Sequence, residues 1–142
     1  MQARHFDSYT SARSNLRSVL DAAQDGCITT IDRDRERFAV VDAVTLQAQL
    51  SRLLPSGAVV AAEGGGWVAF LPGLPVSGEG EDLDGALDDL LEALRDYAED
   101  WNDHLRTAPN HQASWALVAL VELSDDDQLR AWLLSGGPDD PR

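Results

Sequence analysis

Lysine is absent from this 142-residue sequence, and cysteine occurs once. Every strong cation is therefore an arginine, whose planar guanidinium suits bidentate contacts with phosphates or base edges. The single cysteine, Cys27, excludes an internal disulfide and a cysteine-rich zinc site, which fits a reducing compartment. No apolar run approaches the roughly 20 residues of a membrane helix, and residues 1–16 lack the apolar stretch of a signal peptide. We therefore expect a cytoplasmic protein.

The net charge of −14 is unevenly distributed along the chain. Residues 1–54 hold seven arginines and seven acidic residues, whereas residues 55–142 hold four arginines and eighteen acidic residues. All of the negative excess therefore lies in the second part. Two parts with such different charge suggest two different partners. The apolar share of 44% is ordinary for a globular protein, so we expect the chain to fold.

The first part carries the pattern of a small α+β unit. Apolar residues recur at helical spacing over residues 11–24, with Thr10 as the expected cap and Gly26 as the stop. The expected buried stripe of this helix is Ala12, Leu16, Val19, Leu20 and Ala23. Two short apolar runs, residues 28–31 and 37–41, flank a charged tip and predict a β-hairpin.

A second unit is predicted after a short helix over residues 44–54, because Pro55–Gly57 interrupts the pattern. The second unit begins with a hairpin whose strands span residues 58–62 and 67–71. A bend rich in proline and glycine, residues 72–80, is expected to follow.

Three further elements are predicted in the second unit. A long amphipathic helix spans about residues 83–105 with Asp82 as its cap. The nearly continuous apolar run 114–123 predicts a strand covered on both faces. A last helix follows a cap within residues 124–127. The predicted organisation is therefore an N-terminal domain, a C-terminal domain and a flexible tail, at residues 1–54, 58–134 and 135–142.

The run Gly64-Gly65-Gly66 raises the question of a phosphate-binding loop. Such a loop needs a following Lys-Ser/Thr pair and a helix whose free N–H groups meet the anion, and neither is expected here. The acidic surroundings would also repel a nucleotide. We interpret the three glycines as a hairpin turn.

Two motifs in the first part form a recognisable pattern. They are Ala12-Arg13-x-Asn15-Leu16 at the first helix, and Ile31-Asp32-Arg33 with Ala39-Val40-Val41 in the hairpin. With these motifs, residues 6–54 resemble the Phd/YefM family of antitoxins. The resemblance implies a homodimer that binds an operator upstream of its own operon, with Arg13 and Arg33 on the DNA-facing side. The hairpin tip, Arg35-Glu36-Arg37, departs from the small polar turn usual in that family.

Residue chemistry is compatible with the same DNA-facing side. Arg13 and Arg17 are four positions apart and share a face of a continuous helix. Arg13 would also lie in its first turn, where free N–H groups favour phosphate. The predicted DNA-binding residues are Arg13, Arg17, Asn15, Arg33 and Arg35. An alternative for the tip is a solvated cluster of charges that pair with one another.

A second pattern begins at the glycine turn. The sequence GWVAFLPGLP from Gly66 to Pro75 is followed by Gly80, by LDGAL from Leu83 to Leu87, and by Glu92-Ala93-Leu94. Over residues 58–101 this order is similar to HicB-type antitoxins. That resemblance implies a small fold related to a degenerate ribonuclease H sheet, without its catalytic carboxylates, which sequesters a toxin. Val76-Ser77 replaces the usual Gly-Cys, and the DNA-binding part lies N-terminal here. The predicted toxin-binding residues are Trp67, Phe70, Glu79, Glu81 and Asp82.

Catalytic and metal-binding residues are not evident. The acidic clusters within residues 79–84 and 125–127 fall at predicted helix starts, where capping and the helix dipole explain them. His104 and His111, with Asp103, do not have a standard metal-ligand spacing. We therefore expect no enzymatic activity and no cofactor. Five large aromatic residues are expected mainly in the core, with one or two exposed as anchors for a partner: Trp67, Phe70, Trp101, Trp115 and Trp132.

The sequence thus predicts an α+β type II antitoxin that binds a basic toxin and, as a homodimer, represses its own operon. One alternative is a transcriptional regulator whose second domain senses a small molecule between its sheet and its long helix. Another is an interaction adaptor that does not touch DNA.

Overall fold

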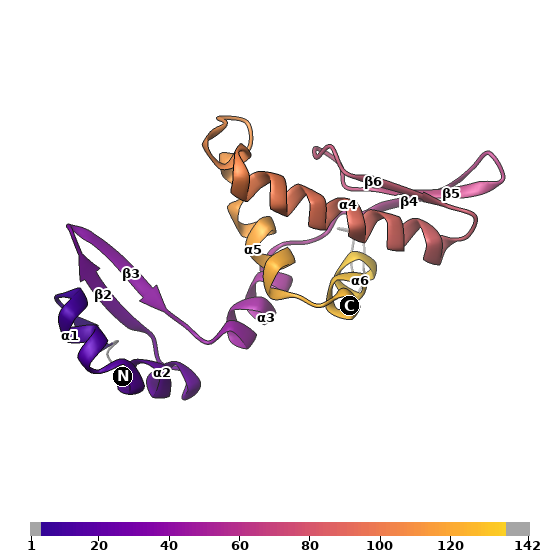
Figure 1. The fold of residues 1–142 in the computed structure, drawn as a ribbon. Coiled ribbons are helices and arrows are strands. Elements are labelled where there is room, and N and C mark those ends of the chain that lie inside the picture. The colour runs from indigo at the N-terminus through magenta and orange to yellow at the C-terminus, as the bar shows by residue number, and fades with distance from the viewer. Residues whose placement is uncertain (1–3, 136–142) are drawn as a thin grey trace. The chain divides into compact units, whose positions relative to one another are not determined.

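The computed structural model describes residues 4–135, in which the chain divides into two compact units after Ala48. The described chain is α+β, with two three-stranded sheets and six α-helices (Figure 1). The division falls inside helix α3 (Ala43–Leu53), a few residues before the break that we predicted at Pro55–Gly57. The predicted tail, apart from Ser135, lies outside the described residues.

The sheet of the first unit contains the predicted hairpin. Strands β2 (Thr29–Arg33) and β3 (Glu36–Val40) are antiparallel, with Arg33 opposite Glu36. Their tip is Asp34-Arg35, and both residues have positive φ, at 52° and 71°. A third strand that we did not predict, β1 (Arg4–Phe6), runs parallel to β2.

The predicted helix over residues 11–24 is two helices, so the expectation of one continuous helix is wrong. Helix α1 (Tyr9–Ser14) and helix α2 (Leu16–Gln24) meet at Asn15, whose φ of −120° is not helical. The Asn15 amide donates to the carbonyl of Ser11 at 2.9 Å, and the Ser14 hydroxyl donates to the carbonyl of Thr10 at 3.0 Å. Short polar side chains that bond the preceding turn in this way favour a bend or an end.

The cap of the first helix and its buried stripe also differ from the prediction. Ser8, not Thr10, is the cap, and its hydroxyl accepts from the N–H of Ser11 at 3.1 Å. Leu16 and Leu20 are 53% and 55% exposed, although we expected both in the core. The buried apolar side chains of the first unit are small: Ala12, Val19, Ala22 and Ala23.

The second unit is built on the antiparallel sheet β4-β5-β6. Strands β4 (Val59–Glu63) and β5 (Gly66–Phe70) form the predicted hairpin, whose turn residues Gly64 and Gly65 have φ of 59° and 84°. The third strand, β6 (Ser77–Gly80), replaces part of the predicted bend. It escaped prediction because its glycines weaken any strand pattern.

The long helix was predicted correctly. Helix α4 (Leu83–Asp103) packs on β5 and β6 and begins at Asp82, whose carboxylate accepts from the N–H of Gly85 at 2.8 Å. The contact with β6 is very close, since a Cβ atom placed on Gly78 would lie 2.3 Å from the backbone nitrogen of Leu90. The buried residues of α4 are Ala86, Leu87, Leu90, Leu91, Leu94, Tyr97, Ala98 and Trp101.

The predicted strand over residues 114–123 is a helix, so that prediction is wrong. Two short 3-10 turns, Leu105–Thr107 and Gln112–Ser114, lead into helix α5 (Trp115–Leu123), which packs against α4. A short helix that is apolar on most sides has no periodicity that distinguishes it from a buried strand.

The last helix, α6 (Asp126–Leu134), was predicted, and its cap is Asp125 within a capping box formed with Gln128. Trp132 is buried and donates its indole N–H to the carbonyl of Leu54 at 2.7 Å. Trp101 is buried as expected, whereas Trp115 is 57% exposed. None of the described helices combines the length and the apolar character needed to cross a membrane.

Candidate functional site

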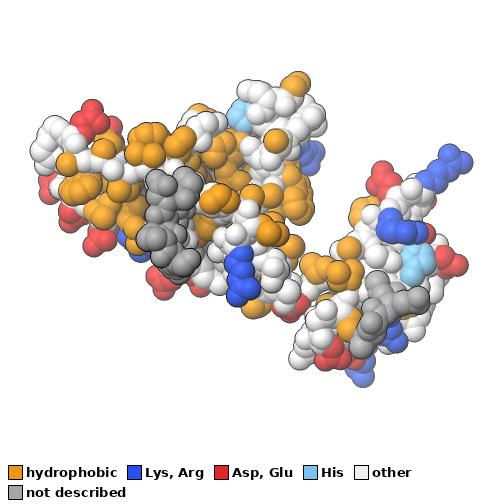
Figure 2. Space-filling model, turned by 180° about the vertical axis from the view of Figure 1, so that it is seen from behind, with side chains coloured by type: hydrophobic (Ala, Val, Ile, Leu, Met, Phe, Trp, Pro, Cys, Tyr) orange, Lys and Arg blue, Asp and Glu red, His pale blue; other side chains and the backbone are white. Residues whose placement is uncertain are grey.

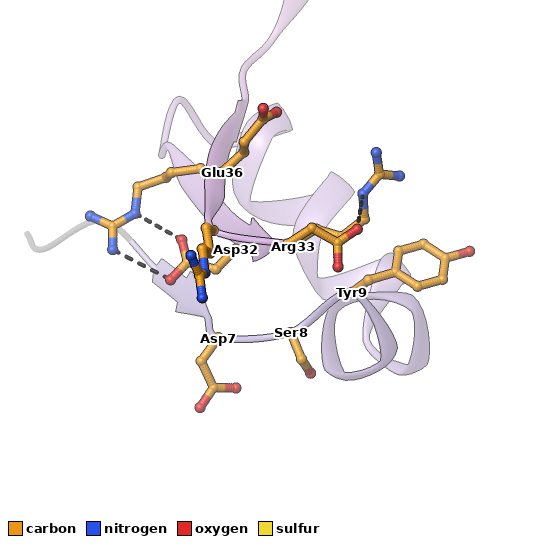
Figure 3. A pocket seen from close by; sticks show the side chains of 9 residues that line it. Asp7, Ser8, Tyr9, Asp32, Arg33 and Glu36 are labelled. Atoms are coloured by element: carbon orange, nitrogen blue, oxygen red, sulfur yellow. Dashed lines mark hydrogen bonds and ion pairs between the residues drawn. The ribbon is translucent and has the colours of Figure 1, made fainter.

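A solvent-open depression of about 590 Å³ lies between the start of α1 and the β2–β3 hairpin (Figure 3). It brings together two of the predicted DNA-binding residues, Arg33 and Arg35. Arg13, Asn15 and Arg17 do not line it, although all three are exposed. The lining residues are Asp7, Ser8, Tyr9, Asp32, Arg33, Asp34, Arg35, Glu36 and Arg37.

Two of the predicted arginines lie over exposed aromatic rings. The guanidinium carbon of Arg13 is 5.9 Å from the centre of the Tyr9 ring, and that of Arg33 is 5.6 Å from the centre of the Phe38 ring. Such cation–π contacts hold an arginine side chain in place while its N–H groups stay in water. Tyr9 lines the same depression as Arg33, so both arginines belong to one neighbourhood.

The predicted position of Arg13, in the first turn of a helix that also contains Arg17, is wrong. Arg13 lies in the last turn of α1, not in the first, so the positive end of the helix dipole does not act at this residue. Arg13 and Arg17 belong to different helices, because the chain leaves the helical conformation at Asn15. Their spacing of four positions therefore gives no common face.

Asp32 is the centre of the charge network in the depression. Its carboxylate accepts from Nε of Arg37 at 2.9 Å, and Nε2 of His5 is 3.2 Å away. The hydrogen bond from Arg37 lowers the pKa of Asp32, and the same bond raises the pKa of Arg37. Arg37 is therefore committed to an internal ion pair and is less able to contact a ligand.

The remaining tip charges are loosely held. Nε of Arg33 is 3.9 Å from the carboxylate of Asp34, and no ion pair involves Arg35 within residues 4–135. The depression has three arginines and four acidic residues. The depression therefore offers a phosphate single guanidinium donors, but its net charge is not positive.

In the second unit, a depression of about 540 Å³ adjoins the glycine turn. It brings together Trp67, Glu79 and Glu81 of the predicted toxin-binding set. Phe70 and Asp82 do not line it, and the Asp82 carboxylate is occupied as the cap of α4. Glu63, which we did not predict, contributes a third carboxylate. Its position next to the glycine turn, at the end of an apolar strand, is the signal that could have identified it.

His111 belongs to an internal polar network. Its Nδ1 is 2.8 Å from the hydroxyl of Tyr97, and this hydroxyl donates to Ser114 at 3.0 Å. The indole N–H of Trp101 donates to the carbonyl of His111 at 2.9 Å. Residues 4–135 contain no group of three or more His, Cys, Asp or Glu side chains placed to hold a metal ion.

The structure defines an α+β chain with two small sheets, in which residues 1–54 carry no net charge and residues 55–142 carry −14. No protein-family model matches the chain, and no curated protein matches it. A crystal structure from Syntrophomonas wolfei subsp. wolfei, described as the antitoxin part of a candidate toxin/antitoxin system, has the same fold. The TM-score is 0.77 at 21% sequence identity, over 93% of this chain and 96% of that chain.

Proposed function

We propose that this chain is the cytoplasmic antitoxin of a type II toxin–antitoxin system. In this proposal the second unit binds and neutralises a basic toxin, and the first unit represses the operon by binding DNA. The main support is a fold shared with an antitoxin over 93% of the chain. The charge division, zero over residues 1–54 and −14 over residues 55–142, provides independent support for two different partners.

The first unit, which resembles the Phd/YefM family, is proposed to act as a homodimer. Among its described residues, the buried apolar side chains are three alanines and one valine, a small core for a unit of this size. Several apolar side chains of the same unit are exposed, among them Leu16, Leu20, Ile28, Phe38 and Val44. A two-fold mate that covered part of this surface would supply the missing burial.

DNA binding is proposed for the face that carries the stacked arginines. Arg13 and Arg33, each over an aromatic ring, supply donors to phosphates or base edges. Arg17, Asn15 and Arg35 are exposed and complete the proposed set. Because one subunit carries no positive excess, two copies of the arginine face in a dimer are needed for useful affinity.

Toxin neutralisation is proposed for the second unit, which is similar to HicB-type antitoxins. Trp67, Glu79, Glu81 and Phe70 would contact the toxin, while Asp82 acts indirectly by capping α4. The acidic surface would attract a basic protein and raise its rate of encounter. The bound antitoxin would then occlude the toxin's site for its own anionic substrate. We propose no enzymatic activity and no cofactor.

The alternative of a small-molecule sensor has less support. It would place a ligand between the sheet and α4, where the backbones of Gly78 and Leu90 approach too closely to admit even a methyl group. Neighbouring genes would separate the two proposals, because an adjacent gene for a small basic protein favours the antitoxin and a metabolic operon favours the sensor.

The DNA-binding part of the proposal is tested by a gel shift on the chain's own upstream region. Arg13→Ala should weaken binding at least tenfold, since a charge-assisted phosphate contact contributes about 1.5–3 kcal/mol. Arg52→Ala is the matched control, because Arg52 is exposed on α3 and outside the proposed face. Equal binding by both variants would remove Arg13 from the DNA site.

The toxin-binding part is tested by co-expression with the product of the adjacent gene. The full chain should rescue growth and co-purify with that product as a stable complex. Failure of both would reject neutralisation by this chain, whatever the outcome of the gel shift.

A further inference from the structure

Strand β4 is apolar and yet exposed to solvent. All five of its residues, Val59 to Glu63, are exposed, and Val59 and Val60 are each 40% exposed. The cause is the position of α4, which packs on β5 and β6. Gly78 and Gly80 face this helix so closely that no side chain fits, whereas β4 lies beyond its reach.

The outer edge of β4 also has free backbone groups. A two-residue turn with positive φ at Gly64 and Gly65 makes Glu63 and Gly66 a hydrogen-bonded pair. Alternation along an antiparallel ladder then directs the N–H and C=O groups of Val60 and Ala62 away from β5. No backbone partner for these groups is found within residues 4–135.

The usual protection of an edge strand is missing here. Natural edge strands carry lysine, proline or a bulge that prevents pairing with another chain. The sequence of β4 is VVAAE, and its register with β5 is regular from Val59 to Glu63. An apolar, regular and unprotected edge is suited to accept an added strand.

The charges near β4 favour a basic protein as its partner. From Leu53 to Leu94 the sequence has eight acidic residues and no basic residue. Glu63, Glu79 and Glu81 are exposed, and none of them forms an ion pair within the described part of the chain. Figure 2 shows the larger unit with hydrophobic side chains gathered on its surface and acidic side chains at the rim. A second copy would bring the same negative charges together, whereas a basic protein would neutralise them.

We propose that β4 is a docking edge at which a basic partner protein adds a strand to the β4-β5-β6 sheet. The added strand would bond the outward backbone groups of Val60 and Ala62. Arginine or lysine side chains of the partner would lie next to Glu63, which is on β4 itself. This inference rests on the proposed function, because it takes the basic partner to be the toxin.

The test compares two substitutions at one position in the full-length chain. Ala62→Pro removes the outward N–H without removing a ladder bond to β5, and Ala62→Ser keeps that N–H. The probe is the purified product of the adjacent gene, and its affinity is measured by calorimetry. Ala62→Pro should weaken binding at least tenfold, while Ala62→Ser should change it less than threefold. Equal affinity of both variants would overturn the docking edge.

Further results complete the test. If the wild-type chain does not bind the probe, the proposed function is rejected. If the wild type binds and the Ala62 variants do not differ, only the docking edge is rejected. If Ala62→Pro alters the urea transition, then Val60→Pro and the backbone-conserving Val60→Thr repeat the comparison at the other outward position. In hydrogen exchange, the amides of Val60 and Ala62 should be protected at least tenfold in the complex. Protection of these amides in the free chain, lost on dilution, would assign β4 to self-association and overturn the assignment to a basic partner.

Discussion

The contact between β6 and α4 gives a quantitative test of the second unit. A Cβ atom on Gly78 would lie 2.3 Å from the backbone nitrogen of Leu90 and 2.4 Å from the carbonyl oxygen of Ala86. Real Cβ atoms essentially never approach closer than 3.0 Å. Gly78→Ala therefore forces the helix and the strand apart by about 0.7 Å, and backbone on both sides prevents a side chain from yielding instead.

The expected cost of Gly78→Ala is about 3 kcal/mol or more of unfolding free energy, at the upper end of the range for overpacking. Gly64→Ala is the matched control, since nothing lies within 4 Å of a Cβ atom there and φ is +59°. Its cost is the left-handed conformation alone, about 1 kcal/mol. The two identical chemical changes should thus differ by about 2 kcal/mol.

Urea denaturation monitored by tryptophan fluorescence measures this difference. All four tryptophans lie between Trp67 and Trp132, so the signal reports the second unit alone. Gly78→Ala should shift the midpoint strongly to lower urea and Gly64→Ala only slightly. Midpoints that coincide would show that α4 does not rest on the backbone of β6, and the argument for an uncovered β4 would lose its basis.

Three smaller predictions concern single groups. Thr29 is fully buried and its hydroxyl has no hydrogen-bond partner among the described residues, so Thr29→Val should leave the unit as stable or stabilise it by about 1 kcal/mol. Hydrogen exchange of the β2 amides measures this change in stability. Thr30→Val, which loses the hydrogen bond between the Thr30 hydroxyl and the ring of His5, should increase exchange instead. Arg37→Gln should raise the pKa of Asp32 towards its ordinary value of 3.8 in an NMR titration. Because folding lowers the pKa of Asp32, its pair with Arg37 stabilises the folded protein above pH 3.8, and this contribution is lost as the pH falls through the folded pKa. An unchanged Asp32 titration would mean that no such pair exists in solution. Trp115→Phe should remove most acrylamide quenching, since Trp115 is 57% exposed, and persistent quenching would contradict the exposed position.

Local rules in the sequence were sufficient for about half of the elements. The stripe and cap of α4 and the paired glycines of the β4–β5 turn are set by residues close together in the chain. Such signals predict an element without knowledge of its neighbours.

The failures have different physical causes. Strand β6 (Ser77–Gly80) has glycine where α4 leaves no space, and glycine by itself predicts a bend. Helix α5 is apolar on most of its surface, so its periodicity could not separate helix from strand. The break at Asn15 arises from side chains that bond backbone carbonyls, which propensity does not capture.

The sequence predicted which residues would form the candidate sites, but not how those residues are arranged. The sequence predicted arginines of the first unit and acidic residues of the second as site residues. It did not show that Arg37 is paired with Asp32, nor that Arg13 and Arg33 lie over Tyr9 and Phe38. The contacts of Arg37 with Asp32 and of Arg33 with Phe38 join two strands and depend on the register of the hairpin, whereas the contact of Arg13 with Tyr9 depends on where α1 begins and ends.

The small core of the first unit connects its folding to its proposed activity. Leu16 and Leu20 are 53% and 55% exposed, so burying the exposed half of each contributes about half of the roughly 1.5–3 kcal/mol of a whole leucine, or about 3–6 kcal/mol over both copies of a dimer. Association itself costs an estimated 4–15 kcal/mol, so the two terms are of similar size. The proposed dimer would therefore form and dissociate within a range of concentrations that a cell can change. A repressor built in this way would respond to its own abundance, while the second unit, whose core includes Leu87, Leu90 and Leu94, would stay folded and able to bind its proposed partner.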